Sequence, residues 1–407
     1  MTVMGTARIR KWRQRLARHA KGLASAWRYS GALAREHGFS RLRMLGEAAW
    51  LALRGRMNVD TYFHYRLFDP QLSADAKRRY LSEAPRENAR LWAALTPARY
   101  RCLYENKLVF NQYFSSLGLP LAVMFGVFDP EVGRSMDGQS LRTEAELREF
   151  IRRFRRDGFV FKPAEGIQGH QVVVLTGAAA DDPDTFLSLS GERYDAAALV
   201  AVARDTAALE LQNPQSNFSS FLLEERIRPH PELAELIGPT LCCVRIVTVV
   251  ALDGSPKIVA SVYKLQPKPV GVDHLIYGAL GCWVDPDTGA LGPGRSRSGY
   301  ESTSVIPGTG RSFVGYRLPC WNQVKEVVLQ AAAAFPWARG IGWDIGISDR
   351  GPVIIEGNAR WSPSLVQLPA PRGLMDGELK AVYDALRYSP VRSKAWRSHA
   401  ARSAAAS

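Results

Sequence analysis

The chain has 407 residues, 46% hydrophobic and 23% charged, which is enough for two or three domains or one multi-lobed catalytic unit. Its net charge of +14 is confined to the ends, because residues 1–60 carry thirteen Lys and Arg against three acids and residues 390–407 carry four against none. The middle of the chain is formally neutral. That excludes the basic working surface expected of a nucleic-acid enzyme, so we expect no nucleic-acid partner.

No apolar run is long enough to span a bilayer, and Arg and Lys interrupt residues 9–20, so we expect no signal peptide. The five cysteines show no CxxC spacing and leave one without a partner. This pattern favours a reducing compartment and argues against a zinc site. We therefore expect a cytoplasmic protein.

The N-terminal part of the chain is predicted to be a basic helical extension over residues 1–84. Residues 6–29 predict an amphipathic helix whose apolar stripe includes Trp12, Leu23 and Trp27. Such a helix is typical of peripheral contact with anionic lipid, here at the inner membrane face. It is also typical of a helix packed on its own protein, and we favour that interpretation.

The chain beyond residue 85 alternates predicted helices and strands, and the tail at 390–407 is predicted to be disordered. Thr143 and Glu146 have the capping-box spacing at the start of a helix. The glycine-rich segment 289–310 is predicted to be a mobile loop. We expect helices over 31–38, 41–54, 106–119, 143–154, 196–207, 321–335 and 376–388, and strands over 121–128, 221–227, 241–252 and 257–263.

A strand, a glycine loop and a returning strand are predicted over Phe159–Leu175. The first strand ends at Lys162, and Gly166 and Gly169 lie in the loop. Two glycines let backbone N–H groups approach an anion, and the lysine supplies positive charge. The segment predicts a phosphate site that is not a Walker A loop, because a strand follows it. The alternative is an ordinary glycine hairpin.

Arg245 lies within a run of β-branched and apolar residues. A charged side chain in such surroundings is usually paired or functional. We therefore treat Arg245 as a candidate site residue.

A polar hairpin is predicted at Ile341–Trp361, with a three-residue loop at 349–351. Strand alternation puts Asp344 on the face opposite Ile345, and Glu356 on the face opposite Ile355. The register pairs Ser348 with Pro352 and sets Asp344 opposite Glu356. Like charges across a sheet repel. A Mg²⁺ ion held by Asp344, Glu356 and Asn358 would compensate them, and the alternative is a hairpin with its polar face in water.

The order of these motifs resembles the ATP-grasp superfamily over residues 100–370. The similarity is greatest to its sugar-transfer-associated branch, which is related to α-L-glutamate ligases. The resemblance implies an α+β fold in which two lobes clamp ATP. The catalytic unit would occupy 85–389, with a smaller lobe at about 120–225. The motifs are Lys107, Lys162-Pro-x-x-Gly-x-x-Gly, Leu223-Glu224-Glu225, Arg245, Asp344 and Glu356-x-Asn358.

The resemblance also implies a role for each motif residue. Lys107 and Lys162 would contact the phosphates. Gly166 and Gly169 would form the flexible lid. The adenine would lie along Glu224, Glu225 and Ile227. Either Glu232 or Glu235 would reach the ribose. Two Mg²⁺ ions would be held by Asp344, Glu356 and Asn358. Arg245 and Lys162 would act in catalysis, and Arg360 is a second candidate for anchoring the acceptor.

Three positions depart from the family pattern. Gly342 stands where many of these ligases have a basic residue two positions before the first metal Asp, which puts more weight on Arg245. Asn106 precedes Lys107 where Asp is common, and His170 follows the second lid glycine.

The implied reaction is an ATP- and Mg²⁺-dependent ligation of a carboxylate to an amine through an acyl phosphate, on small-molecule or sugar-linked substrates. A small-molecule or sugar kinase on the same scaffold is the alternative, and a non-catalytic nucleotide-binding scaffold is a third hypothesis. Product analysis separates the first two. The sequence does not define the oligomeric state.

Overall fold

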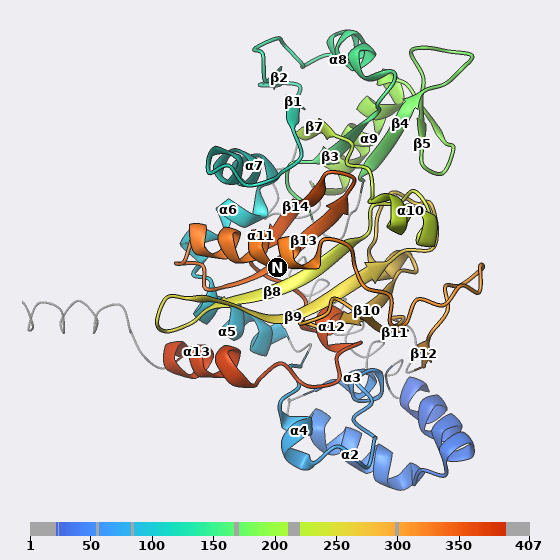
Figure 1. The fold of residues 1–407 in the computed structure, drawn as a ribbon, viewed down its shortest axis with the longest axis vertical. Coiled ribbons are helices and arrows are strands. Elements are labelled where there is room, and N and C mark those ends of the chain that lie inside the picture. The colour runs from blue at the N-terminus through green and yellow to red at the C-terminus, as the bar shows by residue number, and fades with distance from the viewer. Residues whose placement is uncertain are drawn as a thin grey trace, which may run out of the picture.

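The computed structural model describes residues 22–387 apart from 23, 54–56, 83–84, 167–170, 211–219 and 298–300. Two seven-stranded antiparallel sheets with flanking helices form its two lobes, and a group of N-terminal helices lies beyond the second sheet (Figure 1). The α+β class expected from the sequence is confirmed.

The first lobe is a sheet in the order β2-β1-β7-β3-β4-β5-β6. Helices α8 (Glu144–Ile151) and α9 (Ala196–Glu210) pack on it through apolar side chains such as Leu147 and Leu199. The predicted capping box of Thr143 and Glu146 is present at the start of α8. The strands are β1 (Met124–Phe128), β2 (Arg134–Ser135), β3 (Phe159–Pro163), β4 (Val173–Ala178), β5 (Phe186–Ser188), β6 (Arg193–Tyr194) and β7 (Phe221–Glu225).

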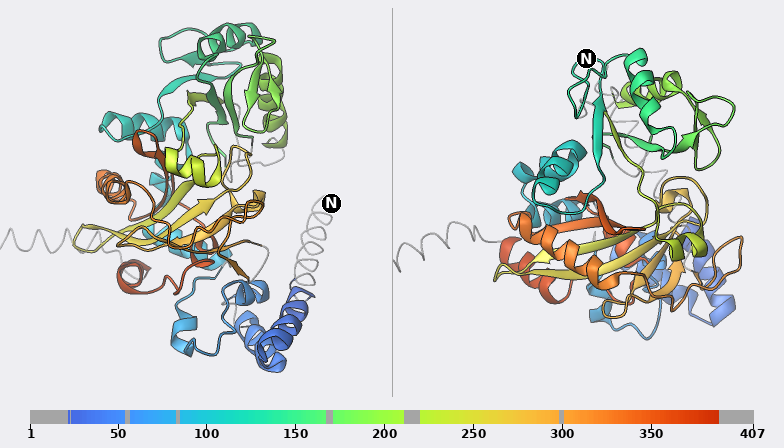
Figure 2. Two further views of the ribbon diagram at one scale, coloured as in Figure 1. Left: turned by 45° about the vertical axis from the view of Figure 1, so that its right-hand side comes forward. Right: turned by 45° about the horizontal axis from the view of Figure 1, so that its top comes forward.

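The second lobe is a sheet in the order β12-β11-β10-β9-β8-β13-β14. Helix α11 (Trp321–Ala334) covers one face, and α5 (Pro85–Leu95) and α13 (Gly377–Arg387) cover the other (Figure 2). The strands are β8 (Cys243–Val250), β9 (Pro256–Leu265), β10 (Leu280–Val284), β11 (Leu291–Arg295), β12 (Ser302–Thr303), β13 (Gly340–Ser348) and β14 (Gly351–Asn358).

Short helices connect these layers. Asn106 caps the start of α7, where its side chain accepts from Leu108 N and Val109 N. The cap fixes the position of Lys107 at the first helical residue. The connecting helices are α6 (Cys102–Glu105), α7 (Lys107–Ser116), α10 (Pro231–Ile237) and α12 (Pro363–Gln367).

The N-terminal helices have a core of their own. Residues 24–37 form one helix without the predicted break near residue 30, and α2 (Arg41–Leu53), α3 (Val59–His64) and α4 (Ala74–Arg78) follow. Ala26, Tyr29 and Leu33 are buried in this core, whereas Trp27 is 62% exposed. The described part of the first helix therefore packs on its own protein with a face other than the predicted stripe. Residues 6–21 lie outside the described residues.

The N-terminal helices are fastened to the second lobe by polar contacts. Arg295 Nη2 donates to His64 O over 2.8 Å. The fully buried Gln367 side chain accepts from Leu81 N at 2.8 Å and donates to Leu81 O at 2.9 Å. None of the helices in the described ranges combines the length and apolar character needed to cross a membrane.

The predicted loop at 289–310 is wrong in part, because it contains β11 and β12. A loop is predicted because segment 289–310 is rich in glycine. Gly294, however, lies inside β11, where a Cβ atom would come within 2.9 Å of Phe313 Cζ. Glycine is required there by close packing and not by chain reversal.

Candidate functional site

The β13–β14 hairpin carries the predicted metal ligands with a different turn. Ser348 pairs with Gly351, so the loop has two residues and the predicted pairing of Ser348 with Pro352 is wrong. A β-bulge between Asp344 and Ile345 then shifts the register by one residue, and Asp344 still lies opposite Glu356. The predicted carboxylate pair is therefore present for a reason that the sequence did not reveal.

The bulge also changes which side chains share a face. Ile354 packs in the main core with Ile345, whereas Ile355 joins Glu356 in lining a cavity. The expectation that Ile355 lies opposite Glu356 is wrong, because the extra residue interrupts strand alternation.

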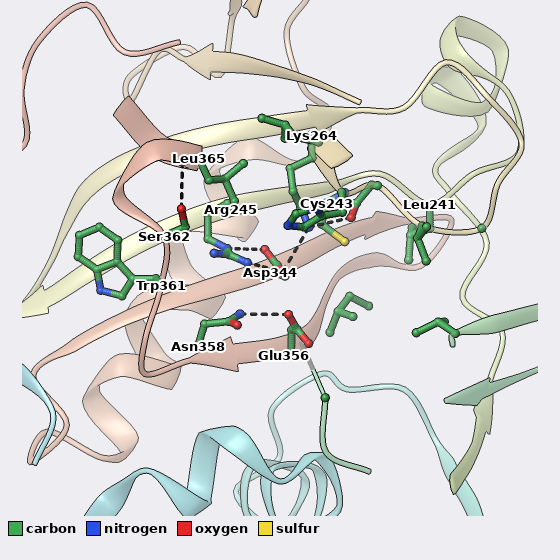
Figure 3. Close-up of a pocket in the computed structure, with 18 of the residues that line it drawn as sticks. Leu241, Cys243, Arg245, Lys264, Asp344, Glu356, Asn358, Trp361, Ser362 and Leu365 are labelled. Atoms are coloured by element: carbon green, nitrogen blue, oxygen red, sulfur yellow. Dashed lines mark hydrogen bonds and ion pairs between the residues drawn. The ribbon is translucent and has the colours of Figure 1, made fainter. Parts of the chain in front are cut away.

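Asp344 lies at the centre of a buried ion-pair network (Figure 3). Arg245 on the neighbouring strand β8 donates from Nε to Oδ1 at 2.6 Å and from Nη2 to Oδ2 at 2.8 Å. Lys264 Nζ lies 3.2 Å from Asp344 Oδ2 and 2.7 Å from Asp273 Oδ1. Asp273 also accepts from Cys243 N at 2.6 Å. Two cations and two carboxylates thus compensate one another.

The pKa values in this network favour the charged forms. Burial alone would raise the pKa of Asp344, but Arg245 and Lys264 hold it well below its ordinary value. Burial likewise opposes the charges of Arg245 and Lys264, yet Asp344 and Asp273 raise the pKa of both. Arg245, Lys264 and Asp344 are therefore charged at neutral pH.

Gly342 leaves space that Arg245 uses. A Cβ atom at Gly342 would lie 2.6 Å from Trp361 Cβ and 3.3 Å from Arg245 Cδ. The site thus has no room for a side chain at 342. The guanidinium group of the site belongs instead to Arg245 on the neighbouring strand β8, where it contacts Asp344.

Two lysines from other elements converge on this region. Lys162 on β3 forms a buried ion pair with Glu224 on β7 at 2.6 Å. Lys107, at the start of α7, donates to Gly166 O at 3.2 Å. Burial lowers the pKa of Lys107, opposed by the charge of Glu356 and assisted by that of Lys162. The structure therefore brings both predicted lysines toward Glu356.

The predicted adenine wall lines the same cavity. Glu224 is held by Lys162, and Glu225 Oε1 accepts from Arg350 Nη2 at 2.7 Å. Ile227 packs beside Ala122. Since both carboxylates are engaged, an adenine ring here would meet apolar side chains and backbone groups.

Other predicted residues lie elsewhere or less deeply. Glu232 accepts from the Tyr316 hydroxyl and Glu235 pairs with Arg311, and neither lines the cavity. Arg360 lines it but is half exposed and pairs with Glu105 at 2.8 Å. Gly166 lines the cavity, whereas Gly169 and His170 lie outside the described residues.

A cavity of about 660 Å³ joins these groups. That volume is within the range of small-molecule binding sites in proteins. It is lined by residues of both lobes, including Lys107, Lys162, Arg245 and Glu356. It also reaches α3 of the N-terminal extension through Asn58 and neighbouring residues.

The predicted metal ligands fit a magnesium ion. Asp344, Glu356 and Asn358 offer only oxygen atoms to a cation, as Mg²⁺ prefers. Glu356 lies directly opposite Asp344 in the β13–β14 pair and lines the cavity with Asn358, so a divalent ion there would neutralise the Glu356 carboxylate. Asn358 Nδ2 donates to Glu356 Oε1 at 3.1 Å. Within the described ranges, no group of three or more His, Cys, Asp or Glu side chains is placed so that it could hold a metal ion.

Sequence reasoning missed Lys264, Asp273 and His274, which also line the cavity. Lys264 had the signal that identified Arg245, a charge within an apolar strand. Asp273 and His274 follow β9 in an irregular segment, where no spacing marks them.

Comparison with solved structures gives low sequence identities. Biotin carboxylase of Campylobacter jejuni has a TM-score of 0.41 at 11% identity, with 70% of this chain and 47% of that chain covered. The D-alanine-D-alanine ligase of Coxiella burnetii has 0.39 at 9%, covering 74% and 62%. The L-amino acid ligase of Bacillus licheniformis has 0.35 at 12%, covering 69% and 48%. This chain thus spans about half to three-fifths of the length of each.

No curated protein matches the sequence. The profile of a family described as sugar-transfer associated ATP-grasp matches residues 86–383, well over half of the chain. The N-terminal helices precede this segment. The protein therefore belongs to the sugar-transfer associated ATP-grasp family.

Proposed function

We propose that the protein is an ATP- and Mg²⁺-dependent ligase that joins a carboxylate to an amine through an acyl phosphate. The observation that carries the proposal is one cavity in which Lys107 and Lys162 face Glu356 and Asn358, with Arg245 beside them. Phosphoryl transfer needs positioning and neutralisation of charge more than a covalent partner, and these side chains supply both.

The reaction has two balanced steps. A carboxylate oxygen of the acceptor forms a bond to the γ-phosphorus while the bond to the β,γ-bridging oxygen breaks, releasing ADP. The amine nitrogen then forms a bond to the acyl carbon, phosphate leaves, and the proton of the amine passes to phosphate. A magnesium ion at Glu356 and Asn358 would supply further neutralisation of phosphate charge.

The side chains of this protein would hold the reacting groups. Lys107 and Lys162 would contact the phosphates, since each ammonium keeps donors beyond its present contact. Arg245 donates from Nε and Nη2 to Asp344, so its Nη1 would donate to the developing acyl phosphate. Arg360 would reach the acceptor only by leaving Glu105.

The test is product analysis of the full-length protein with MgATP, carboxylates and amines. A ligase releases ADP and phosphate only when both substrates are present. A kinase would instead retain the phosphate on one acceptor. Glu356→Gln should lower turnover roughly 100-fold, because it removes a charge that positions the phosphates. Glu235→Gln, outside the cavity, is the matched control, and full turnover in Glu356→Gln would contradict the proposal.

A further inference from the structure

The cavity is also lined by three segments to which the proposed phosphate chemistry gives no role, and we call the space between them the second compartment. One wall is α3 of the N-terminal extension, through Asn58, Asp60 and Thr61. Another contains His274 and Arg297, and the third is the segment from Ser362 to Leu368. A Cβ atom at Gly342 would meet both Trp361 Cβ and Arg245 Cδ, so the third wall begins beside Arg245.

The wall contributed by α3 has a fixed position. The His64 carbonyl at the end of α3 accepts from Arg295 of β11. The next part of the extension is held by the two hydrogen bonds between Gln367 and Leu81. Phe63 and Tyr62 are fully buried behind the wall. Because these contacts join α3 to the second lobe, the extension belongs to the binding site.

His274 is a hydrogen-bond donor to this compartment. Its Nδ1 accepts from Ile276 N at 3.2 Å, so the neutral ring carries its proton on Nε2. Burial, with help from Lys264 and Arg245, lowers the pKa of His274 to about 4. The ring is therefore neutral at pH 7 and offers an N–H group.

Arg297 supplies the positive charge of the compartment. No ion pair joins it to another residue in the described ranges, and it lines the cavity together with His274. The guanidinium and the imidazole N–H suit hydroxyl oxygens of an acceptor whose carboxylate is held beside Arg245, where the acyl phosphate would form. Asp60 also lines the cavity, and its buried Oδ1 has no hydrogen-bond partner among the described residues, so it suits a hydroxyl donor.

The remaining lining groups suit hydroxyls. The Asn58 side chain makes no capping bond at the start of α3 and stays available to a ligand. Ser362 and Ser364 share a hydrogen bond of 2.9 Å between hydroxyls and offer further donors and acceptors. A compartment lined by amide, carboxylate and hydroxyl groups matches a ligand with several hydroxyls.

We propose that the acceptor is a hydroxyl-rich carboxylate of the sugar-acid class. It binds between α3 of the N-terminal extension, His274 and Arg297, and the Ser362–Ser364 segment. The inference rests on the proposed ligase function, because that function requires a carboxylate acceptor.

The experiment uses the full chain with MgATP and hydroxylamine, which traps an acyl phosphate as a hydroxamate. The probes are D-glucuronate and D-galacturonate, with D-glucose, propionate and L-glutamate for comparison. We expect hydroxamate and ADP from the two uronates, with kcat/KM at least roughly tenfold above propionate and L-glutamate, since a site built for hydroxyls rejects ligands that lack them. Glucose should give no hydroxamate.

Two pairs of variants test the walls. Asn58→Trp fills the compartment from α3, and Gln71→Trp changes an exposed amide of the same extension outside it. Arg297→Gln removes the cation of the compartment, and Arg311→Gln removes an exposed arginine that pairs with Glu235. Each first member should raise the uronate KM about tenfold or more and leave the KM for ATP unchanged. Asn58→Trp would do so by blocking the space, and Arg297→Gln by removing charged hydrogen bonds, which contribute on this scale. The controls should change neither.

Thermal-shift measurement with MgATP alone separates the two proposals. If MgATP stabilises the protein but no uronate is activated, or propionate or L-glutamate is preferred, the sugar-acid inference is overturned and nucleotide binding stands. Equal changes of both KM values in Asn58→Trp and Arg297→Gln would also overturn it. If MgATP gives no shift, both proposals fail.

Discussion

Asp344 contacts two cationic side chains, Arg245 and Lys264, and these contacts determine how a substitution in the site changes the stability of the fold. Its bidentate contact with Arg245 and its contact with Lys264 leave no uncompensated charge in the buried network. A buried ion pair is costly to break on one side, because the remaining charge has lost its partner without regaining water.

Arg245→Met should therefore destabilise the fold. We expect the free energy of unfolding to fall by about 3 kcal/mol, the lower end for a broken buried pair, because Lys264 still compensates Asp344. Urea denaturation measures it. Arg311→Met, which removes an exposed pair with Glu235, should change stability by less than about 1 kcal/mol. Equal effects of the two substitutions would contradict the structure.

His274 should give the stability a pH dependence of definite sign. Burial, then Lys264 and Arg245, lower its pKa from 6.5 to about 4, with Arg297 adding to this and Asp344 opposing it. Between those values the unfolded chain binds a proton that the folded protein does not, so stability rises with pH across that window and is flat above it. His274→Gln should flatten the urea midpoint between pH 4.5 and 6.5 and match the parent slope at pH 8. His37→Gln, outside the cavity, serves as the control, and an unchanged slope in His274→Gln would count against a buried neutral imidazole.

At the scale of elements, the β13–β14 hairpin shows what periodicity can and cannot predict. Alternation identified Asp344, Glu356 and Asn358 as the polar side, and the facing carboxylates are present. The turn length and the compensating bulge were not predictable, because both depend on packing against neighbouring strands. Lys264, on the partner strand β9, carries the same signal as Arg245, since it is a charged residue within an apolar strand.

Gly342 on β13 should not tolerate a side chain. In Gly342→Ala the new Cβ meets Trp361 Cβ at 2.6 Å and presses on Arg245, so we expect a loss of about 1–3 kcal/mol and lower turnover. Gly292→Ala on β11 is the control, because the nearest atom there is 3.5 Å away in ordinary contact. Denaturation and steady-state turnover measure the two effects. Equal stability of the two variants would show that β13 relaxes freely.

At the scale of the whole molecule, the site exists only where distant parts of the chain meet. The sequence predicted an α+β fold, and its candidate site residues Lys107, Lys162, Arg245, Asp344 and Glu356 line one cavity. The sequence motifs did not predict that α3 lines the cavity, since that contact joins residues near 60 to residues near 297 and 362 without a local pattern. Nor could they reveal that Glu232 and Glu235 face away from it.

The docking of the extension has a consequence for how the chain can be divided. Gly373 lies so close to Arg79 that a Cβ atom would come within 2.3 Å of its carbonyl carbon, and Gln367 is buried with its amide bonded to Leu81. A fragment cut at the limits of the family match, residues 86–383, would leave these surfaces bare. We expect it to be less soluble than the full chain and to melt at a lower temperature. The folded unit therefore begins before the family match does. A chimaera between relatives should fold only when the helices before residue 85 are transferred together with the rest of the chain.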